Sequence, residues 1–177
     1  MMSEKGIGLF CVLCAFLVAV LGITPTRSGA EEPASGGTLV SALRQIPVFQ
    51  RLDDGRLRKV AEVVEVSERQ GGELIIEQGK RIGKMLIALD SEVQIKIDRK
   101  PIAVLPKNSL VGEIEFLVDV PASADVMLLR KSRVISLEHA DLKRVMDADS
   151  VIGYLLMYEI AKMEANRLRM NNQRQQK

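Results

Sequence analysis

Apolar and polar residues alternate in short runs through the middle of this 177-residue chain, and this alternation restricts the fold more than any other feature. A period of two residues is typical of β-strands that bury one face. Gly, Pro, Asn and Asp separate the runs as turn signals. The expected strands are Val63–Glu68, Glu73–Glu77, Met85–Leu89, Glu92–Asp98, Ile102–Leu105, Asp125–Leu129 and Val134–Glu138. Short strands at this spacing predict a mainly β fold, a closed roll or sandwich.

The clearest alternation lies in the run that begins at Glu92. Val93, Ile95 and Ile97 are expected to face the interior, with polar residues between them. Helical periods flank the β region. The expected helices are 38–44, one capped by Asp53 or Asp54, a short one at 141–146 and a long one at 149–170. Residues 171–177 are expected to form a polar tail.

The N-terminus carries an apolar segment of 17 residues without a charge, from Ile7 to Ile23. Small residues at Ser28 and Ala30 are typical of a signal peptidase site. The segment is long for a cleaved signal and short for a membrane helix, so residues 1–30 are either a signal peptide or a retained anchor. Residues 31–37 then form a linker. We expect a membrane-anchored, secreted or periplasmic protein, with the domain outside the cytoplasm.

The composition excludes several classes of function. The net charge is +2, which does not favour a nucleic-acid-binding protein. The chain contains one histidine, so a metal centre or catalytic site that needs two histidines is excluded. Both cysteines lie in the apolar N-terminal segment, which leaves no thiolate metal site in the rest of the chain. No enzyme activity, metal or cofactor is therefore expected.

Four segments resemble the cyclic nucleotide-binding domain family in order and spacing. They are IPVFQRLDDGRLRKVAEVVE from Ile46, GGELIIEQGKRIGKMLIAL from Gly71, VGEIEFL from Val111 and SRVISLEHADLKRVM from Ser132. The resemblance covers about residues 46–169. It implies a jelly-roll of eight strands with flanking helices and places the domain at 38–170.

The same family carries a phosphate-binding cassette, and the chain keeps part of it. Gly112 and Glu113 match the Gly-Glu pair of the family, and Pro121 matches its proline. In the family the glutamate accepts a hydrogen bond from the ribose, and an arginine after the proline binds the cyclic phosphate. The resemblance therefore implies a ligand site that includes Gly112 and Glu113.

The rest of the cassette departs from the family. Ala122 stands where the arginine is expected, and Asp125 stands where a hydroxyl is expected, near the position of the anion. Ser123 supplies a neutral hydroxyl, which does not replace a guanidinium. Loss of a charge-assisted contact of about 1.5–3 kcal/mol, with added repulsion, should weaken phosphate binding by at least roughly 100-fold. We expect the chain not to bind cyclic AMP tightly.

Two hypotheses about function follow. The first is a non-enzymatic regulatory or interaction module whose nucleotide site has decayed. The alternative is a sensor of a small ligand, or a weak sensor of cyclic nucleotide, that uses the retained Gly-Glu pair. The long helix has apolar residues on more than one face, so a homodimer or another protein partner is expected there, with interface candidates Ile152, Leu155 and Leu156. The basic residues from Arg167 onward are expected to be solvated, with anionic lipid as the alternative partner.

Overall fold

The structure is a computed structural model, and it describes residues 36–175. Residues Ala34–Lys177 form one compact unit. The elements, in chain order, are α1 (Gly36–Arg44), a 3-10 turn η1 (Pro47–Phe49), α2 (Asp54–Ala61), β1 (Val64–Arg69), β2 (Leu74–Ile76), β3 (Lys84–Ala88), β4 (Val93–Ile97), β5 (Lys100–Leu105), β6 (Leu110–Val111), α3 (Glu113–Val118), β7 (Asp125–Leu128), β8 (Ser132–Glu138), α4 (His139–Ala148) and α5 (Ser150–Gln175).

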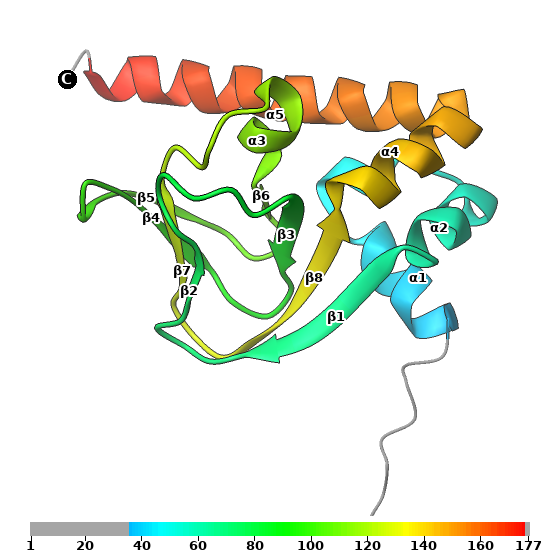
Figure 1. Cartoon of the computed structure of the whole chain (residues 1–177), viewed down its shortest axis with the longest axis horizontal. Coiled ribbons are helices and arrows are strands. Elements are labelled where there is room, and N and C mark those ends of the chain that lie inside the picture. Colours follow the sequence, from blue (N-terminus) through cyan, green and yellow to red (C-terminus); the bar gives the residue numbers. More distant parts are fainter. Residues whose placement is uncertain (1–35, 176–177) are drawn as a thin grey trace, which may run out of the picture. The chain divides into compact units, whose positions relative to one another are not determined.

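Eight strands form two antiparallel sheets of four strands each. The first sheet has the order β1-β8-β3-β6, and the second has the order β2-β7-β4-β5. Strands that are neighbours in space are mostly distant in sequence, as in β1 and β8, so the sheets fold over each other as a roll. Helices α1, α2 and α4 gather at one end of this roll, and α5 runs along the side that carries α3 and β6 (Figure 1). The expectation of a mainly β jelly-roll with flanking helices and a long C-terminal helix is confirmed for the described residues.

Two apolar clusters hold the fold together. One lies between the two sheets and contains Val93, Val126 and Leu128 among its buried residues. The larger cluster joins the first sheet to the helices, and Leu57 and Ile135 are buried in it. Burial of one such side chain contributes about 1.5–3 kcal/mol. This larger cluster therefore fixes α1, α2, α4 and α5 against the roll.

Local sequence explains where α2 begins. The side chain of Asp53 accepts a hydrogen bond from the backbone N–H of Arg56 at 2.9 Å, which satisfies one of the free donors of the first turn. Of the two expected caps, Asp53 is therefore the N-cap, and Asp54 is the first helical residue.

The structure differs from the expected elements in three places. The short strand β6 was not expected, because two residues are too few to show a period. Ile97 is 38% exposed and not buried as expected, because it is the last residue of β4 and lies beside the hairpin turn at Asp98 and Arg99. Helix α5 continues to Gln175, so most of the expected polar tail is helical.

The expected signal peptide or anchor at 1–30 lies outside the described residues, as does most of the expected linker at 31–37. Among the helices that the structure describes, none has the length and apolar character needed to cross a membrane.

Candidate ligand cavity

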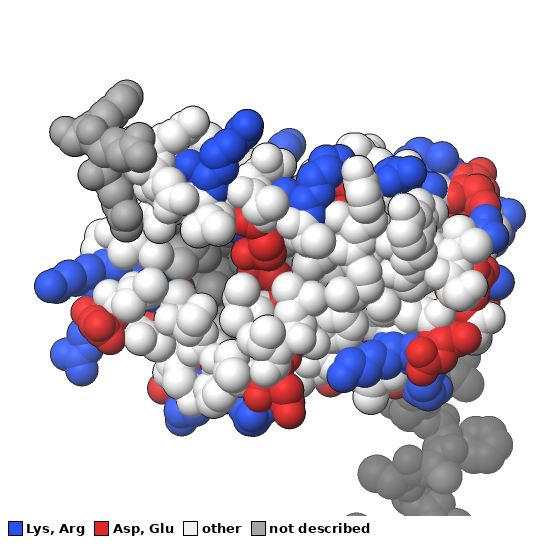
Figure 2. Space-filling view, turned by 90° about the horizontal axis from the view of Figure 1, so that it is seen from above, with Lys and Arg blue, Asp and Glu red and all other residues white. Residues whose placement is uncertain are grey.

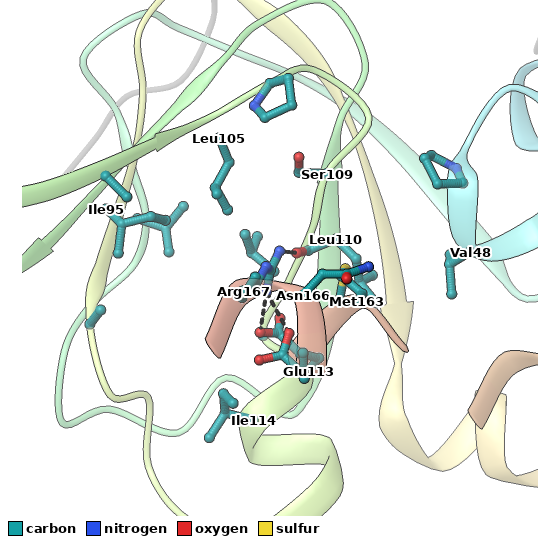
Figure 3. Close-up of a pocket in the computed structure, with 18 of the residues that line it drawn as sticks. Val48, Ile95, Leu105, Ser109, Leu110, Glu113, Ile114, Met163, Asn166 and Arg167 are labelled. Carbon is teal, nitrogen blue, oxygen red and sulfur yellow. Dashed lines mark hydrogen bonds and ion pairs between the residues drawn. The ribbon is translucent and has the colours of Figure 1, made fainter. Parts of the chain in front are cut away.

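A cavity of about 1040 Å³ opens between the interior of the roll and the C-terminal half of α5. Its roll side is mostly apolar, with Ile95 and Leu105 among the lining residues, and its α5 side includes Met163, Asn166 and Arg167 (Figure 3). Strands of both sheets and the loop from Ala122 to Ala124 complete the wall. A concave, largely apolar site with a few polar groups is the usual form of a small-molecule site.

Gly112 lies at the junction between β6 and α3, and its conformation allows that junction. Its φ is +87°, in the left-handed region that glycine adopts without strain. A Cβ atom at this position would lie 2.7 Å from the carbonyl oxygen of Lys84. Only glycine therefore fits here, and it places Glu113 as the first residue of α3, beside the cavity.

The carboxylate of Glu113 is buried and paired with an arginine from α5. Arg167 donates through Nη1 to Glu113 Oε1 at 2.6 Å and to Glu164 at 2.8 Å, and through Nη2 to the carbonyl of Leu110 at 2.7 Å (Figure 3). These bonds join the start of α3 and strand β6 to α5. The guanidinium therefore pairs with one oxygen of the glutamate to which the resemblance assigns a ligand contact.

Burial raises the pKa of Glu113 to about 7, although the charge of Arg167 opposes this rise. The side chain is 5% exposed, and its second oxygen, Oε2, has no hydrogen-bond partner. A buried polar atom without a partner costs free energy, unless a ligand or water satisfies it. Glu113 thus retains hydrogen-bonding capacity at the wall of the cavity.

The loop that carries the remaining cassette residues is held by its backbone. Ala122 donates to the carbonyl of Lys80 at 2.9 Å and accepts from Gly79 at 2.8 Å. The methyl group of Ala122 packs against the apolar cluster between the sheets. Ala122 and the exposed Ser123 line the cavity, whereas the exposed Pro121 does not. The structure thus places Gly112, Glu113, Ala122 and Ser123, four of the five predicted ligand residues, at one cavity.

The prediction for Asp125 is wrong. Asp125 is not among the residues that line the cavity, and its carboxylate accepts a hydrogen bond from the backbone N–H of Gln78 at 2.8 Å. The side chain secures the turn after β2 and lies outside the lining of the cavity. The argument against phosphate binding therefore depends on Ala122 and not on Asp125.

The charged residues that line the cavity nearly balance. They are Lys107, Lys162 and Arg167 on the basic side and Glu113, Glu115, Glu159 and Glu164 on the acidic side, three against four. The carboxylate of Glu115 accepts from the backbone N–H groups of Ile82 and Gly83 and so has a structural role. This balance gives a dianionic or polyanionic ligand no net attraction. Within residues 36–175, no cluster of His, Cys, Asp and Glu has the form of a metal site.

The structure contradicts two of the three interface candidates on α5. Ile152 is 0% exposed and Leu156 is 1% exposed, and both belong to the core that joins the helices to the roll. Leu155 is partly buried against the same core. The sequence shows that α5 has two apolar faces, but it does not show which face the roll covers.

The sequence interpretation of Arg167 is also wrong, because it treated this residue as part of a solvated basic segment. Arg167 lies 54 residues from Glu113 and meets it only through the packing of α5 over the roll. No local motif links the two positions, so the pair was not predictable from spacing.

The architecture is thus a roll of two antiparallel sheets with a cavity that the C-terminal helix α5 covers. Residues 67–149 match the family model described as the cyclic nucleotide-binding domain. This match covers 83 of the 177 residues and confirms the resemblance that the four segments indicated.

Individual relatives agree with this assignment. A provisionally assigned potassium channel protein of Rhodopseudomonas palustris is 24% identical over 148 residues, which are 80% of this chain and 36% of that protein. This chain thus spans about a third of that relative. A cyclic nucleotide-binding domain from Methylobacillus flagellatus has a similar fold, with a TM-score of 0.68, 14% identity and coverage of 78% of this chain and 81% of that chain.

A third relative is bound to a ligand that is not a cyclic nucleotide. It is the regulatory subunit of a cAMP-independent protein kinase A from Trypanosoma cruzi, bound to guanosine. The TM-score is 0.57 at 19% identity, and the match covers 66% of this chain and 42% of that chain. At this identity the likeness concerns the fold.

Proposed function

We propose that this chain is a non-enzymatic regulatory module that does not bind cyclic AMP tightly. The observation that carries the proposal is the state of Glu113: its carboxylate is paired with Arg167 at 2.6 Å, and the loop opposite it offers Ala122 and no arginine. A cyclic phosphate in this cavity would lack the guanidinium that offsets its desolvation, and such an unpaired buried charge costs several kcal/mol. The retained fold supports a regulatory role without that ligand.

The alternative from the sequence, a small-ligand sensor, is supported by a different observation. Glu113 Oε2 is buried without a partner at an apolar cavity of about 1040 Å³. That arrangement suits a neutral ligand with an apolar body and a hydroxyl donor, which has no phosphate to neutralise. A nucleoside has these properties, and the relative bound to guanosine supports the idea. A neutral nucleoside is therefore the ligand class that we propose to test against cyclic nucleotides.

Isothermal titration of residues 34–177 with cyclic AMP, cyclic GMP, adenosine and guanosine tests both proposals. We expect no binding of cyclic AMP or cyclic GMP at concentrations up to about 100 μM. The nucleoside alternative predicts a heat of binding from adenosine or guanosine. A dissociation constant for cyclic AMP in the low micromolar range would overturn the main proposal. Heat from none of the four would overturn the nucleoside alternative and leave the main proposal standing.

A gain-of-function variant makes the test sharper. Ala122→Arg restores the missing charge at the cavity wall and should tighten cyclic AMP binding by at least roughly 10-fold. Pro121→Arg is the matched control, since it adds the same charge at the neighbouring exposed position outside the cavity. Equal effects of the two variants would show that bulk charge, and not the lost cassette arginine, limits binding.

We also propose that the chain is anchored to a membrane or exported, with its domain outside the cytoplasm. The support is the uncharged segment from Ile7 to Ile23 and the small residues that follow it. A fusion of residues 1–37 to a reporter that is active only outside the cytoplasm should be active. Activity of the reporter only in a cytoplasmic fusion would contradict the proposal.

The output of such a module requires a partner. We propose that α5 provides the contact, either with a second copy of the chain or with another protein, because this helix closes the cavity on one side and is open to solvent on the other.

A further inference from the structure

The rim of the cavity consists of apolar side chains that are open to solvent. Ile102 and Val104 of β5 are 51% and 52% exposed, and Leu168 and Met170 of α5 are 62% and 50% exposed. All four line the cavity, so β5 and the C-terminal part of α5 meet at this rim. Exposed aliphatic side chains that gather at one opening are typical of a surface that binds a partner.

The exposed charges beside the rim are mostly basic. Residues 97–107 and 168–173 contain one acidic residue, Asp98, and four basic residues. The basic residues are all exposed, and they are Arg99, Lys100, Lys107 and Arg169. Figure 2 shows Lys and Arg side chains that project, beside a smaller acidic area, from the end of the molecule where Figure 1 shows the β4–β5 hairpin and the end of α5. The solvent-facing charge of these segments is therefore positive.

The acidic residues of the cavity wall do not offset this charge. Glu113 and Glu115 are buried. The side chains of Glu159 and Glu164 are 11% and 26% exposed, and each is paired with the basic residue three positions later on α5. These carboxylates are therefore buried or neutralised within the domain, whereas the basic residues beside the rim face outward.

This combination of side chains favours one class of partner, an anionic lipid bilayer. Aliphatic side chains flanked by Lys and Arg are typical of surfaces that enter the headgroup boundary of an anionic membrane. A second copy of the chain on the same face would bring like charges together, which disfavours a symmetric dimer there. A nucleic-acid strand is usually bound by aromatic side chains that stack on its bases, and residues 97–107 and 168–173 contain no aromatic residue.

We infer that the rim of the cavity, with the basic residues beside it, docks on the surface of an anionic phospholipid bilayer. The inference goes beyond the proposed anchoring by residues 1–30, because it assigns a membrane contact to the folded domain itself. Residues 34–177 lack the apolar segment from Ile7 to Ile23. An experiment on residues 34–177 therefore tests the rim alone, and its result does not bear on the proposal for the N-terminus.

Flotation with phospholipid vesicles tests the docking on residues 34–177, which form one compact unit with its own core. The vesicles contain either phosphatidylglycerol and phosphatidylcholine in equal parts or phosphatidylcholine alone. We expect the protein to float with the anionic vesicles at about 0.1 M salt and to be released at about 0.5 M salt, where screening is stronger. Failure to bind the anionic vesicles, or equal binding to the neutral ones, would overturn the inference.

A charge variant tests whether the rim makes the contact. Lys100→Gln/Arg169→Gln should weaken vesicle binding by roughly 25-fold, because each basic residue near an anionic surface contributes about fivefold. The matched control is Arg58→Gln/Arg130→Gln, which removes the same charge from two exposed residues, one on α2 and one beside the opposite end of β4. The control should retain most of the affinity. Equal weakening by the two double variants would contradict docking through the rim.

Depth-dependent quenching locates the contact without removing any charge. Residues 34–177 contain no cysteine, so Val104→Cys and Val66→Cys each provide a single thiol for a fluorescent label. The two valines are 52% and 48% exposed, and Val66 lies on β1 in the other sheet, outside the lining of the cavity. Brominated lipid in the anionic vesicles should quench the label at position 104 and not the label at position 66. Quenching at both positions, or at neither, would show that the rim is not the docking surface.

Discussion

Arg167 of α5 donates a hydrogen bond to the buried carboxylate of Glu113 at the start of α3, across 2.6 Å. The two residues are 54 positions apart in sequence, and their pair fixes the C-terminal half of α5 over the cavity. Because the same guanidinium also binds the carbonyl of Leu110, α5, β6 and α3 are held at one point. Arg167 therefore adds a polar anchor at the cavity to the apolar packing that already holds α5 against the roll.

Loss of Arg167 should destabilise the protein in a pH-dependent way. Arg167→Met keeps the apolar stem but leaves Glu113 buried without its partner, which should cost about 2–3 kcal/mol at pH 8. The cost should be smaller at pH 5, where Glu113 is protonated. Urea denaturation at both pH values measures the effect. Arg169→Met is the control, an exposed residue of the same helix, and should change the free energy of unfolding by less than about 0.5 kcal/mol.

Glu113 should make the stability of the wild type depend on pH. Its pKa is raised to about 7 in the folded protein by burial, above its ordinary value of 4.5. A raised pKa means that the folded state binds the proton more tightly, so the contribution of Glu113 is fully present below pH 4.5 and is lost as the pH rises through 7.

Between pH 5 and pH 8, the free energy of unfolding of the wild type should therefore fall by about 2–3 kcal/mol relative to that of Glu113→Gln. Urea denaturation of both proteins across this range provides the comparison. Parallel pH profiles for the two proteins would contradict the prediction.

Replacement of Gly112 should be costly for two reasons that act together. Gly112→Ala forces a side chain into φ +87° and brings its Cβ to 2.7 Å from the carbonyl of Lys84. We expect a loss of about 3 kcal/mol or more, against about 1 kcal/mol for Gly72→Ala. Gly72 is the matched control, since its φ is +80° but no atom lies within 4 Å of its Cβ position. Similar thermal unfolding midpoints for the two variants would show that the close contact is relieved at little cost.

The two faces of α5 should respond differently to truncation. Leu156→Ala removes a side chain that is 1% exposed and should cost about 2–5 kcal/mol. Tyr154→Ala removes one that is 65% exposed and should change the stability of the monomer by less than about 0.5 kcal/mol. Unfolding should be measured at a concentration below that of self-association. A larger cost for Tyr154→Ala than for Leu156→Ala would reverse the assignment of the two faces.

Much of the architecture is local and was therefore predictable from the chain. Alternation places strands such as β4, and Asp53 caps α2 through a hydrogen bond to Arg56 three residues away. Gly112 and Glu113 were assigned to the ligand site because they are adjacent and stand in a motif, and the structure puts both at the cavity wall. Signals of this kind come from residues that are close in sequence, so a single sequence is enough to detect them.

The remaining features depend on contacts between distant segments. The sequence showed two apolar faces on α5, but both have helical spacing, and only packing against the roll determines that Ile152 is core and Tyr154 is exposed. Asp125 was expected near a bound anion, and the fold turns it to the backbone of Gln78. Arg167 lies in a basic stretch with no motif, and it meets Glu113 because α5 crosses the roll at that point. Periodicity and motifs identify the strands, the cap of α2 and the resemblance to the family. The packing of α5 on the roll determines which of its side chains are buried and brings Arg167 to Glu113.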